Sequence, residues 1–395
     1  MQNVTQKVAF IYILRTLKVN IKMKNTHLIL SLLLIVSFNC KNERAYNEDS
    51  NSEHHAGHSE NASYIDGNAY DKSTVANYLM PNSKDQFLGG IRMIPIQTPK
   101  GEFKVWTKRV GNNPTMKVLL LHGGPGMTHE IFECFDGFFP QENIEYYYYD
   151  QLGSYYSDQP KDLSLWDLDR FVEEVEQVRV ALGLNKDNFY LYGQSWGGIL
   201  GMQYALKYQG HIKGLIISNM VASIPEYQKY SDQVLAPKLD PVILKEIMSY
   251  EDKEDYGNPR YLDLIVKNYY TKHVIRMPVD EWPEPVNRGF KHLNPDVYVT
   301  MQGPSEFGIK GDATLKNWDV TQELKNISVP TLTIGATHDT MDPEHMKWIS
   351  TEVQNGRFLL CPNGSHLSQF DDQKVFFKGL VDFNKDVDEG SFKTE

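Results

Sequence analysis

The sequence predicts an α/β fold in which a mostly parallel β-sheet carries helices on both faces. Short apolar runs typical of buried strands recur from Gln86 onward, and the later runs alternate with helical patterns. The expected strands are Ile91–Ile96, Phe103–Val110, Met116–Leu121, Ile144–Tyr149, Phe189–Tyr192, Leu215–Ile217, Val329–Ile334 and Phe358–Leu360. In such a fold, catalytic groups lie on the loops at the carboxyl ends of the strands.

Length and composition indicate one elaborated catalytic domain. The chain has 395 residues with 41% hydrophobic and 23% charged content, enough to bury a large core. Its net charge of -11 and the lack of a basic stripe argue against nucleic-acid binding. We expect a core at residues 76–221 and 321–395. The intervening residues 222–320, with helical stretches at Asp240–Tyr250 and Pro259–Arg276, should form a helical cap that excludes water and selects substrate.

Residues 1–40 resemble a secretion signal. Lys22 and Lys24 precede the apolar run Leu28–Phe38, which is too short for an ordinary membrane span, and Met23 is an alternative start. The run ends at a loose match to a bacterial lipoprotein cleavage site, which predicts lipid attachment at Cys40. The protein would then be exported and held on a membrane, facing the periplasm or the cell exterior. The alternatives are a cleaved signal without lipid, or an uncleaved anchor.

No metal or cofactor site is predicted. Residues 41–75 are polar and should form a solvated tether, so the histidines within it lack a fixed environment for a metal; they are His54, His55 and His58. Cys134 and Cys361 lie beside predicted active-site loops, and we expect them to be buried as small apolar residues rather than paired.

The predicted active site is organised around a G-x-S-x-G motif at Gly193–Gly197. A buried strand precedes this motif and a helix, Ile199–Tyr208, follows it. This context is typical of a nucleophile elbow, in which small residues let Ser195 sit on a strained turn with its hydroxyl exposed. The alternative is a glycine-rich turn that only packs a helix on the sheet. A catalytic serine requires a histidine to take its proton and a carboxylate to orient that histidine.

Two residues just beyond later strands complete the predicted triad. Asp339 follows Val329–Ile334, and His366 follows the strand at residues 358–361. The chain order serine, aspartate, histidine is the order expected of an α/β-hydrolase fold. Asp342 is a weaker candidate for the acid, and His338 is expected to be an ordinary loop histidine.

A glycine-rich loop predicts the oxyanion hole. The segment His122–Gly126 reads His-Gly-Gly-Pro-Gly and directly follows a predicted strand. A backbone N–H at Gly124 and the N–H of Trp196, which follows the nucleophile, would together bind the developing negative charge. One donor of this kind is typically worth about 3 kcal/mol in the barrier.

These motifs together resemble those of proline iminopeptidases, which are serine aminopeptidases of the α/β-hydrolase superfamily. The likeness runs from Phe87 to Phe383 and rests on five segments: His122–Gly126, Tyr149–Ser154 (Tyr-Asp-Gln-Leu-Gly-Ser), Gly193–Gly198, Gln302–Phe307 (Gln-Gly-Pro-Ser-Glu-Phe) and Gly364–His366. The resemblance implies release of an N-terminal residue, often proline, from small peptides, without a metal.

The resemblance also implies that carboxylates recognise the free amine of the peptide. Glu306 matches the family's glutamate in the cap. The position after the catalytic acid, a second glutamate in some relatives, is Thr340 here. A broader aminopeptidase or amino-acid amidase is therefore an alternative. Two rivals are an esterase, lactonase or acyl-amide hydrolase with the same triad, and a non-catalytic lipoprotein that binds a peptide or partner.

Overall fold

The computed structural model of the protein describes residues 90–309 and 311–394. The predicted signal, Cys40, the tether and its three histidines lie outside the described residues. Within the described part of the chain, no helix has both the length and the apolar character needed to cross a membrane.

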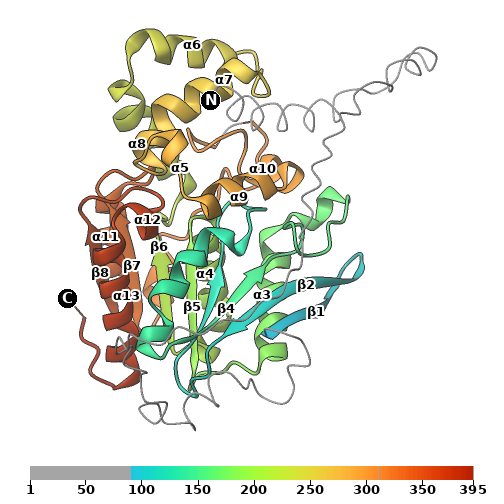
Figure 1. Ribbon diagram of the computed structural model, residues 1–395, viewed down its shortest axis with the longest axis vertical. Coiled ribbons are helices and arrows are strands. Elements are labelled where there is room, and N and C mark those ends of the chain that lie inside the picture. Colours follow the sequence, from blue (N-terminus) through green and yellow to red (C-terminus); the bar gives the residue numbers. More distant parts are fainter. Residues whose placement is uncertain (1–89, 310, 395) are drawn as a thin grey trace, which may run out of the picture.

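Eight strands form one sheet at the centre of the molecule (Figure 1). They are β1 (Ile91–Thr98), β2 (Gly101–Val110), β3 (Lys117–Leu121), β4 (Glu145–Asp150), β5 (Phe189–Gln194), β6 (Gly214–Ser218), β7 (Thr331–Ala336) and β8 (Gly356–Cys361). The order across the sheet is β1-β2-β4-β3-β5-β6-β7-β8. The pairs β1–β2 and β2–β4 are antiparallel and all other pairs are parallel. The predicted mostly parallel sheet is therefore confirmed.

The sequence pattern explains which strands are central. Every residue of β4, β5, β6 and β7 is buried, as expected for strands covered on both faces, whereas β2 alternates between buried and more exposed residues. In β3 the alternation divides the core in two: Leu119 and Leu121 pack with α3 (Leu168–Leu182), α4 (Trp196–Tyr208) and α11 (Pro343–Glu352). Val118 and Leu120 pack on the other face with α13 (Gln373–Asp388).

Helix boundaries follow the capping residues in the sequence. The predicted helix at residues 168–182 is α3, which begins after Asp167, whose side chain accepts a hydrogen bond from the N–H of Arg170. It ends at Gly183, which has a left-handed φ of 68°. The helix that follows the predicted elbow begins at Trp196, three residues before the predicted start.

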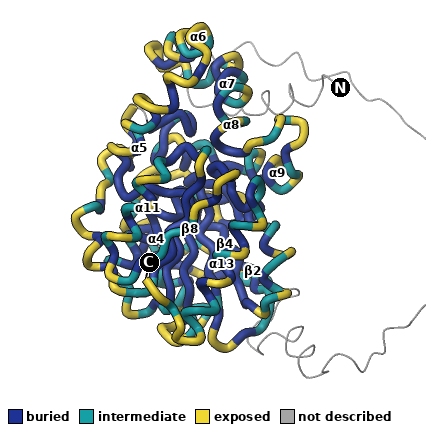
Figure 2. The backbone as a smooth tube through the Cα atoms, turned by 90° about the vertical axis from the view of Figure 1, so that its left-hand side faces the viewer, coloured by how far each residue is buried: buried dark blue, intermediate teal, exposed yellow. Residues whose placement is uncertain are grey.

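In the described part of the insertion between β6 and β7, six segments are α-helices. They are α5 (Ile224–Tyr230), α6 (Pro241–Glu251), α7 (Pro259–Ile265), α8 (Thr271–His273), α9 (Glu284–His292) and α10 (Pro295–Met301). Figure 1 shows this group stacked beyond one end of the sheet, with α6 and α7 farthest from it. An isolated antiparallel bridge between Ser223 and Asp319 joins the two ends of the insertion. In Figure 2 the centre of the molecule is buried, and exposed residues cover the outside of α6.

The predicted helical stretch Pro259–Arg276 is helical as far as His273 and ends three residues earlier than expected. After α7 the chain makes a π-helical turn at Val266–Tyr270, and α8 ends at His273. The physical reason is a competing interaction: the carbonyl of His273 accepts a hydrogen bond from the N–H of His366 at 3.0 Å, and the next carbonyl accepts one from the N–H of Leu367 at 2.8 Å. The helix therefore stops where its backbone holds the loop of the predicted catalytic histidine.

Candidate active site

Ser195 occupies a strained turn between β5 and α4. Its φ of 57° and ψ of −127° lie outside the usual regions for a residue with a side chain. The flanking glycines make the turn possible. A Cβ at Gly193 would lie 2.0 Å from the carbonyl oxygen of Gly197, and a Cβ at Gly197 would lie 2.1 Å from that of Leu121. The structure thus has the strand, tight turn and helix that a nucleophile elbow requires.

Asp339 and His366 form a buried pair beyond the carboxyl ends of β7 and β8. Oδ1 of Asp339 lies 2.8 Å from Nδ1 of His366 and accepts a hydrogen bond from the N–H of Met341 at 3.1 Å. The side chain of Gln194, the residue before the predicted nucleophile, donates a hydrogen bond to the carbonyl of His366 at 2.9 Å. This contact ties the histidine loop to the elbow, so the serine, imidazole and carboxylate belong to one edge of the sheet.

Electrostatics favour a basic imidazole in this pair. Burial alone would lower the pKa of His366, but the Asp339 carboxylate, and after it Glu306 and Asp371, outweigh burial and raise the pKa above its ordinary value. An imidazole held beside a carboxylate in this way accepts a proton readily and stabilises the positive charge it then carries.

The glycine-rich loop after β3 passes directly beside Ser195. A Cβ at Gly123 would lie 3.0 Å from the Cβ of Ser195, and Gly124 has a φ of 106°, which favours glycine. Trp196 is the first residue of α4, so its N–H has no acceptor within the helix. The predicted donors therefore lie on the residue after the serine and on a loop that passes beside the serine.

Two polar side chains near these groups were assigned no role from the sequence. The side chain of Gln151 accepts a hydrogen bond from the indole N–H of Trp196 at 2.7 Å and donates one to the carbonyl of His122 at 3.2 Å. It therefore links the two sides of the predicted oxyanion hole. Asn219 donates a hydrogen bond to Oδ2 of Asp339 at 2.7 Å. Both residues follow the carboxyl end of a strand, which is the signal that could have identified them.

Glu306 is a buried carboxylate with one free oxygen. Its Oε1 accepts a hydrogen bond from the hydroxyl of Tyr298 at 2.7 Å, its N–H donates to the hydroxyl of Tyr270 at 3.0 Å, and its carbonyl accepts from the hydroxyl of Tyr227 at 2.7 Å. Its Oε2 is buried and has no hydrogen-bond partner among residues 90–309 and 311–394. Burial raises the pKa of Glu306, while the nearby His366 opposes this shift.

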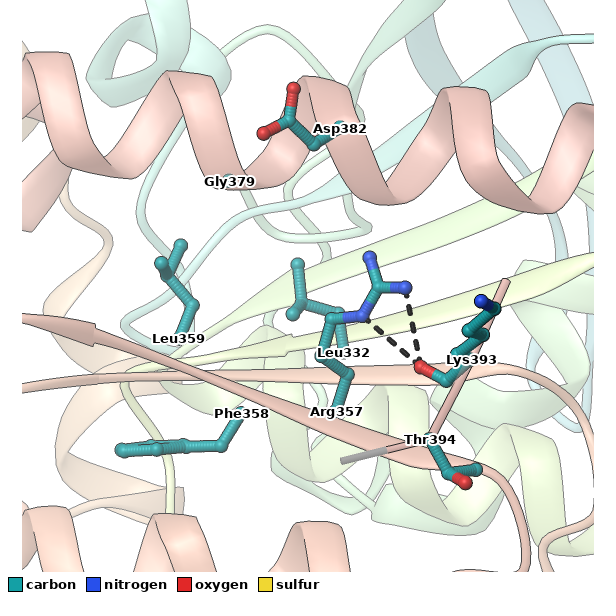
Figure 3. A pocket seen from close by; sticks show the side chains of 8 residues that line it. All are labelled: Leu332, Arg357, Phe358, Leu359, Gly379, Asp382, Lys393 and Thr394. Carbon is teal, nitrogen blue, oxygen red and sulfur yellow. Dashed lines mark hydrogen bonds between the residues drawn. The ribbon is translucent and has the colours of Figure 1, made fainter. Parts of the chain in front are cut away.

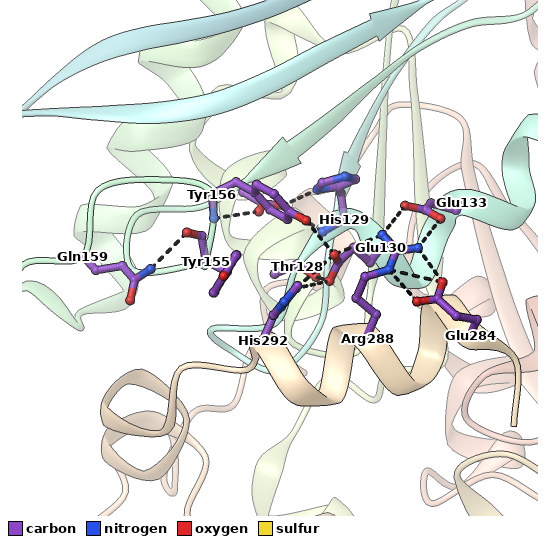
Figure 4. Close-up of polar contacts among 11 residues, drawn as sticks. Thr128, His129, Glu130, Glu133, Tyr155, Tyr156, Gln159, Glu284, Arg288 and His292 are labelled. Carbon is purple, nitrogen blue, oxygen red and sulfur yellow. Dashed lines mark hydrogen bonds and ion pairs between the residues drawn. The ribbon is translucent and has the colours of Figure 1, made fainter. Parts of the chain in front are cut away.

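Helix α9 is fastened to the core by charged side chains (Figure 4). Arg288 forms ion pairs with Glu133 at 2.8 Å and with Glu130 at 3.1 Å, and His292 lies 2.9 Å from Glu130. Both glutamates belong to the short 3₁₀ segment at residues 129–137, which directly follows the glycine-rich loop.

Asn294 extends this attachment to two core loops. Its N–H donates to the carbonyl of Gly126 at 2.9 Å, and its side-chain amide donates to the carbonyl of Gly153 at 2.7 Å. The segment between α9 and α10 therefore fixes the loop of the predicted oxyanion hole from outside the sheet.

The chain matches curated proteins over most of their length. It is 60% identical over 297 residues to the proline iminopeptidase of Flavobacterium johnsoniae, covering 75% of this chain and 99% of that protein. It is 59% identical over 300 residues to the proline iminopeptidase of Elizabethkingia meningoseptica, covering 76% of this chain and 100% of that one. This chain belongs to the proline iminopeptidase family. Residues 117–247 also match the α/β hydrolase fold family.

A solved structure of a proline iminopeptidase has the same fold. The crystal structure of the enzyme from Mycobacterium smegmatis has a TM-score of 0.68 and 25% sequence identity, over 76% of this chain and 99% of that one. The α/β-hydrolase fold predicted from the sequence is therefore confirmed.

This member of the proline iminopeptidase family has Thr340 after the predicted catalytic acid, where some relatives have a second glutamate. Thr340 is fully buried, and its hydroxyl lies 3.3 Å from both Oδ1 of Asp339 and Nδ1 of His366. The side chain therefore contacts the acid–histidine pair itself. This position therefore supplies a hydroxyl group and no second carboxylate.

The remaining candidates have structural roles. Asp342 caps α11 by accepting a hydrogen bond from the N–H of Glu344 at 3.0 Å, and the carbonyl of His338 lies 2.9 Å from Nδ1 of His273. Within the described part of the chain, Cys134 and Cys361 form no disulfide. Cys361 is buried, and Cys134 is partly buried against the same half of the core.

One cavity of about 290 Å³ lies away from these groups, at the amino end of β8 beside α13 (Figure 3). It contains none of the predicted site residues. In the described part of the chain, no group of three or more His, Cys, Asp or Glu side chains is arranged to hold a metal ion.

Proposed function

We propose that this protein is a serine exopeptidase that releases the N-terminal residue, preferably proline, from small peptides. The observation that carries the proposal is the unpartnered, buried Oε2 of Glu306 near the acid–histidine pair. A buried carboxylate with a free oxygen needs a positive partner, and the ammonium group of a peptide's first residue supplies one. The 53–60% identity to proline iminopeptidases supports the same substrate class.

In the proposed reaction, His366 removes the proton of Ser195 as the hydroxyl attacks the carbonyl carbon of the first residue. Asp339 holds the histidine tautomer and stabilises the imidazolium that forms. The N–H groups of Gly124 and Trp196 stabilise the oxyanion. His366 then protonates the leaving amine, the C–N bond breaks, and water activated by the same histidine hydrolyses the acyl-enzyme.

Glu306 restricts this chemistry to the free end of the peptide. Its Oε2 would accept a charge-assisted hydrogen bond from the substrate amine while Tyr298 holds Oε1 in place. A substrate with an acylated amine cannot donate that charged hydrogen bond. It would also leave the carboxylate buried without a partner, which is unfavourable.

The test is hydrolysis of a chromogenic proline arylamide by the full chain and by Ser195→Ala. We expect turnover by the wild-type protein and a loss of several orders of magnitude in the variant, on the order of 10⁵ to 10⁶ in kcat. A fluorophosphonate should label the wild-type protein and not the variant. Ser350→Ala, on the outside of α11, is the matched control and should behave like the wild-type protein. A Ser195→Ala protein with most of its activity would refute the assignment.

We also propose that residues 1–40 direct export and that Cys40 carries a lipid, which would place the enzyme on a membrane with its domain in the periplasm or outside the cell. The sequence supports this through the apolar run that ends just before Cys40. Growth with an alkyne-tagged fatty acid should label the wild-type chain and not Cys40→Ser. Equal labelling of both proteins would contradict the proposal.

A further inference from the structure

Asn219 is a fully buried polar residue on the loop after β6. Its side-chain N–H₂ group donates to Oδ2 of Asp339 at 2.7 Å and to the carbonyl of Ser365 at 3.1 Å. Its Oδ1 accepts from the hydroxyls of Ser218 at 2.8 Å and Ser368 at 3.1 Å. The amide thus joins β6, the acid and the histidine loop, and all four of its hydrogen-bonding positions are used.

The backbone at this position also favours asparagine. Asn219 has a left-handed φ of 54°, a conformation that asparagine and aspartate tolerate better than most residues with side chains. Its N–H donates to the carbonyl of Ile334 in β7 at 2.8 Å. The turn therefore places the side chain of Asn219 against Asp339. Few other residues adopt this backbone conformation without strain.

The two oxygens of Asp339 are held differently. Oδ1 receives hydrogen bonds from the N–H of Met341 and the hydroxyl of Thr340 and faces Nδ1 of His366. Among the described residues, Oδ2 receives its hydrogen bond from Asn219. Without that donor, a buried anionic oxygen would be left unsatisfied, and the carboxylate would be free to rotate away from the imidazole.

We propose that Asn219 is a positioning residue that holds the carboxylate of Asp339 directed at His366. This inference rests on the proposed function only through the triad, since Asn219 has no assigned contact with substrate. Loss of its hydrogen bond destabilises the deprotonated acid–histidine pair more than the protonated pair, because a bound proton already offsets the carboxylate charge. The effect of changing Asn219 should therefore depend on pH.

Other titratable groups surround Asp339 and His366. The variants in the test leave all of these groups in place. They are the carboxyl groups of Glu306 and Asp371, the imidazole of His273, the phenols of Tyr227, Tyr230 and Tyr269, and the thiol of Cys361. These groups come from the cap, α12 (Ser368–Asp371) and β8, and none of them donates a hydrogen bond to Oδ2 of Asp339.

The most informative variant is Asn219→Asp. Aspartate has the same shape, tolerates the same backbone conformation and keeps an oxygen for the two serine hydroxyls. It can donate to Asp339 only while the two carboxyl groups share a proton. Two carboxylates in contact cannot both ionise easily, so this proton is retained into the neutral range and lost at higher pH.

The experiment measures the rate of fluorophosphonate labelling of Ser195 from pH 6 to pH 9. This rate depends on the triad and needs no substrate amine. For the wild-type protein we expect a rise to a plateau as His366 loses its proton. For Asn219→Asp we expect labelling within about tenfold of wild type at pH 6 and about 100-fold slower at pH 9, because the shared proton has left.

Ser368→Ala is the matched control, since it removes a hydroxyl bound to the far side of Asn219. It should slow labelling by about threefold at most, with no change in the shape of the pH profile. A wild-type-to-Asn219→Asp ratio that stays constant from pH 6 to pH 9, in a variant with a wild-type circular dichroism spectrum, would overturn the proposal. A wild-type protein that is labelled but leaves proline arylamides uncleaved would instead refute the proposed function, and the role of Asn219 would still be measured.

Discussion

Replacing Glu306 with glutamine should remove recognition of the free amine while leaving the rest of the site intact. Glutamine keeps an oxygen for the hydroxyl of Tyr298, which lies 2.7 Å from Oε1. The second position, now the unpartnered Oε2, becomes an N–H₂ group that cannot accept a hydrogen bond from an ammonium group. In the variant, the group at the Oε2 position therefore repels the substrate's ammonium group instead of attracting it.

The structure sets the size of the effect. Glu306 is 8% exposed, so a charge pair with the substrate would be largely shielded from water. Removing one partner of a buried, hydrogen-bonded charge pair typically costs about 2–5 kcal/mol. A middle value of about 3–4 kcal/mol corresponds to a loss of about 100- to 1,000-fold in kcat/KM, at about 1.4 kcal/mol per factor of ten.

The assay compares two substrates. With a proline arylamide, Glu306→Gln should show this loss. With p-nitrophenyl acetate, which has no amine, the variant should stay within about threefold of wild type, because the triad is unchanged. Glu281→Gln, an exposed carboxylate on the same insertion, is the control and should match wild type on both substrates. Equal losses on both substrates would refute amine recognition by Glu306 and would indicate damage to the triad instead.

Three further predictions concern the surroundings of the triad. Gln151→Leu removes the hydrogen bond to the Trp196 indole, and we expect kcat for a proline arylamide to fall about 10- to 100-fold with KM changed less, because the oxyanion hole loosens. Glu306→Gln should move the acidic limb of the fluorophosphonate labelling profile to lower pH. The glutamate charge raises the pKa of His366, and its loss lets the imidazole shed its proton earlier; an unmoved limb would show that the two groups are not coupled. Arg288→Ala leaves the glutamates beneath α9 without their cation and should lower the free energy of unfolding by about 2–4 kcal/mol, measured by urea denaturation; an unchanged unfolding midpoint would contradict a stabilising role.

The sheet could be predicted because its signal is local. All eight expected strands are present, and their bounds differ from the expected ones by no more than two residues. Buried parallel strands such as β5 are continuous apolar runs, which are easy to recognise in a sequence. The helical stretch predicted at Pro259–Arg276 ends earlier than expected, at His273, for the opposite reason. Its end is set by hydrogen bonds to the loop of His366, about 90 residues away in sequence, and no local pattern shows such a contact.

The residues of the candidate site likewise fall into two groups, those with a local sequence signal and those defined by long-range contacts. Ser195 has a motif, and Asp339 and His366 follow strands in a recognisable chain order, so all three could be proposed from the sequence. Asn219 lies in no such motif, and the family segment Tyr149–Ser154 that contains Gln151 indicates no role for that side chain. Each acts by a hydrogen bond across 45 to 120 residues of sequence, and only the assembled sheet brings the partners together. The inward orientation of Thr340 was likewise invisible in the sequence, because it depends on the rotation of one side chain beside the acid.

The most direct test of the account is the ratio of kcat/KM for a proline arylamide to that for its N-acetylated form with the wild-type protein. A carboxylate that binds the free amine predicts a ratio of at least about 100 in favour of the unblocked substrate. Equal rates for the two substrates would contradict the account, because they would show that the buried Oε2 of Glu306 does not bind the substrate amine.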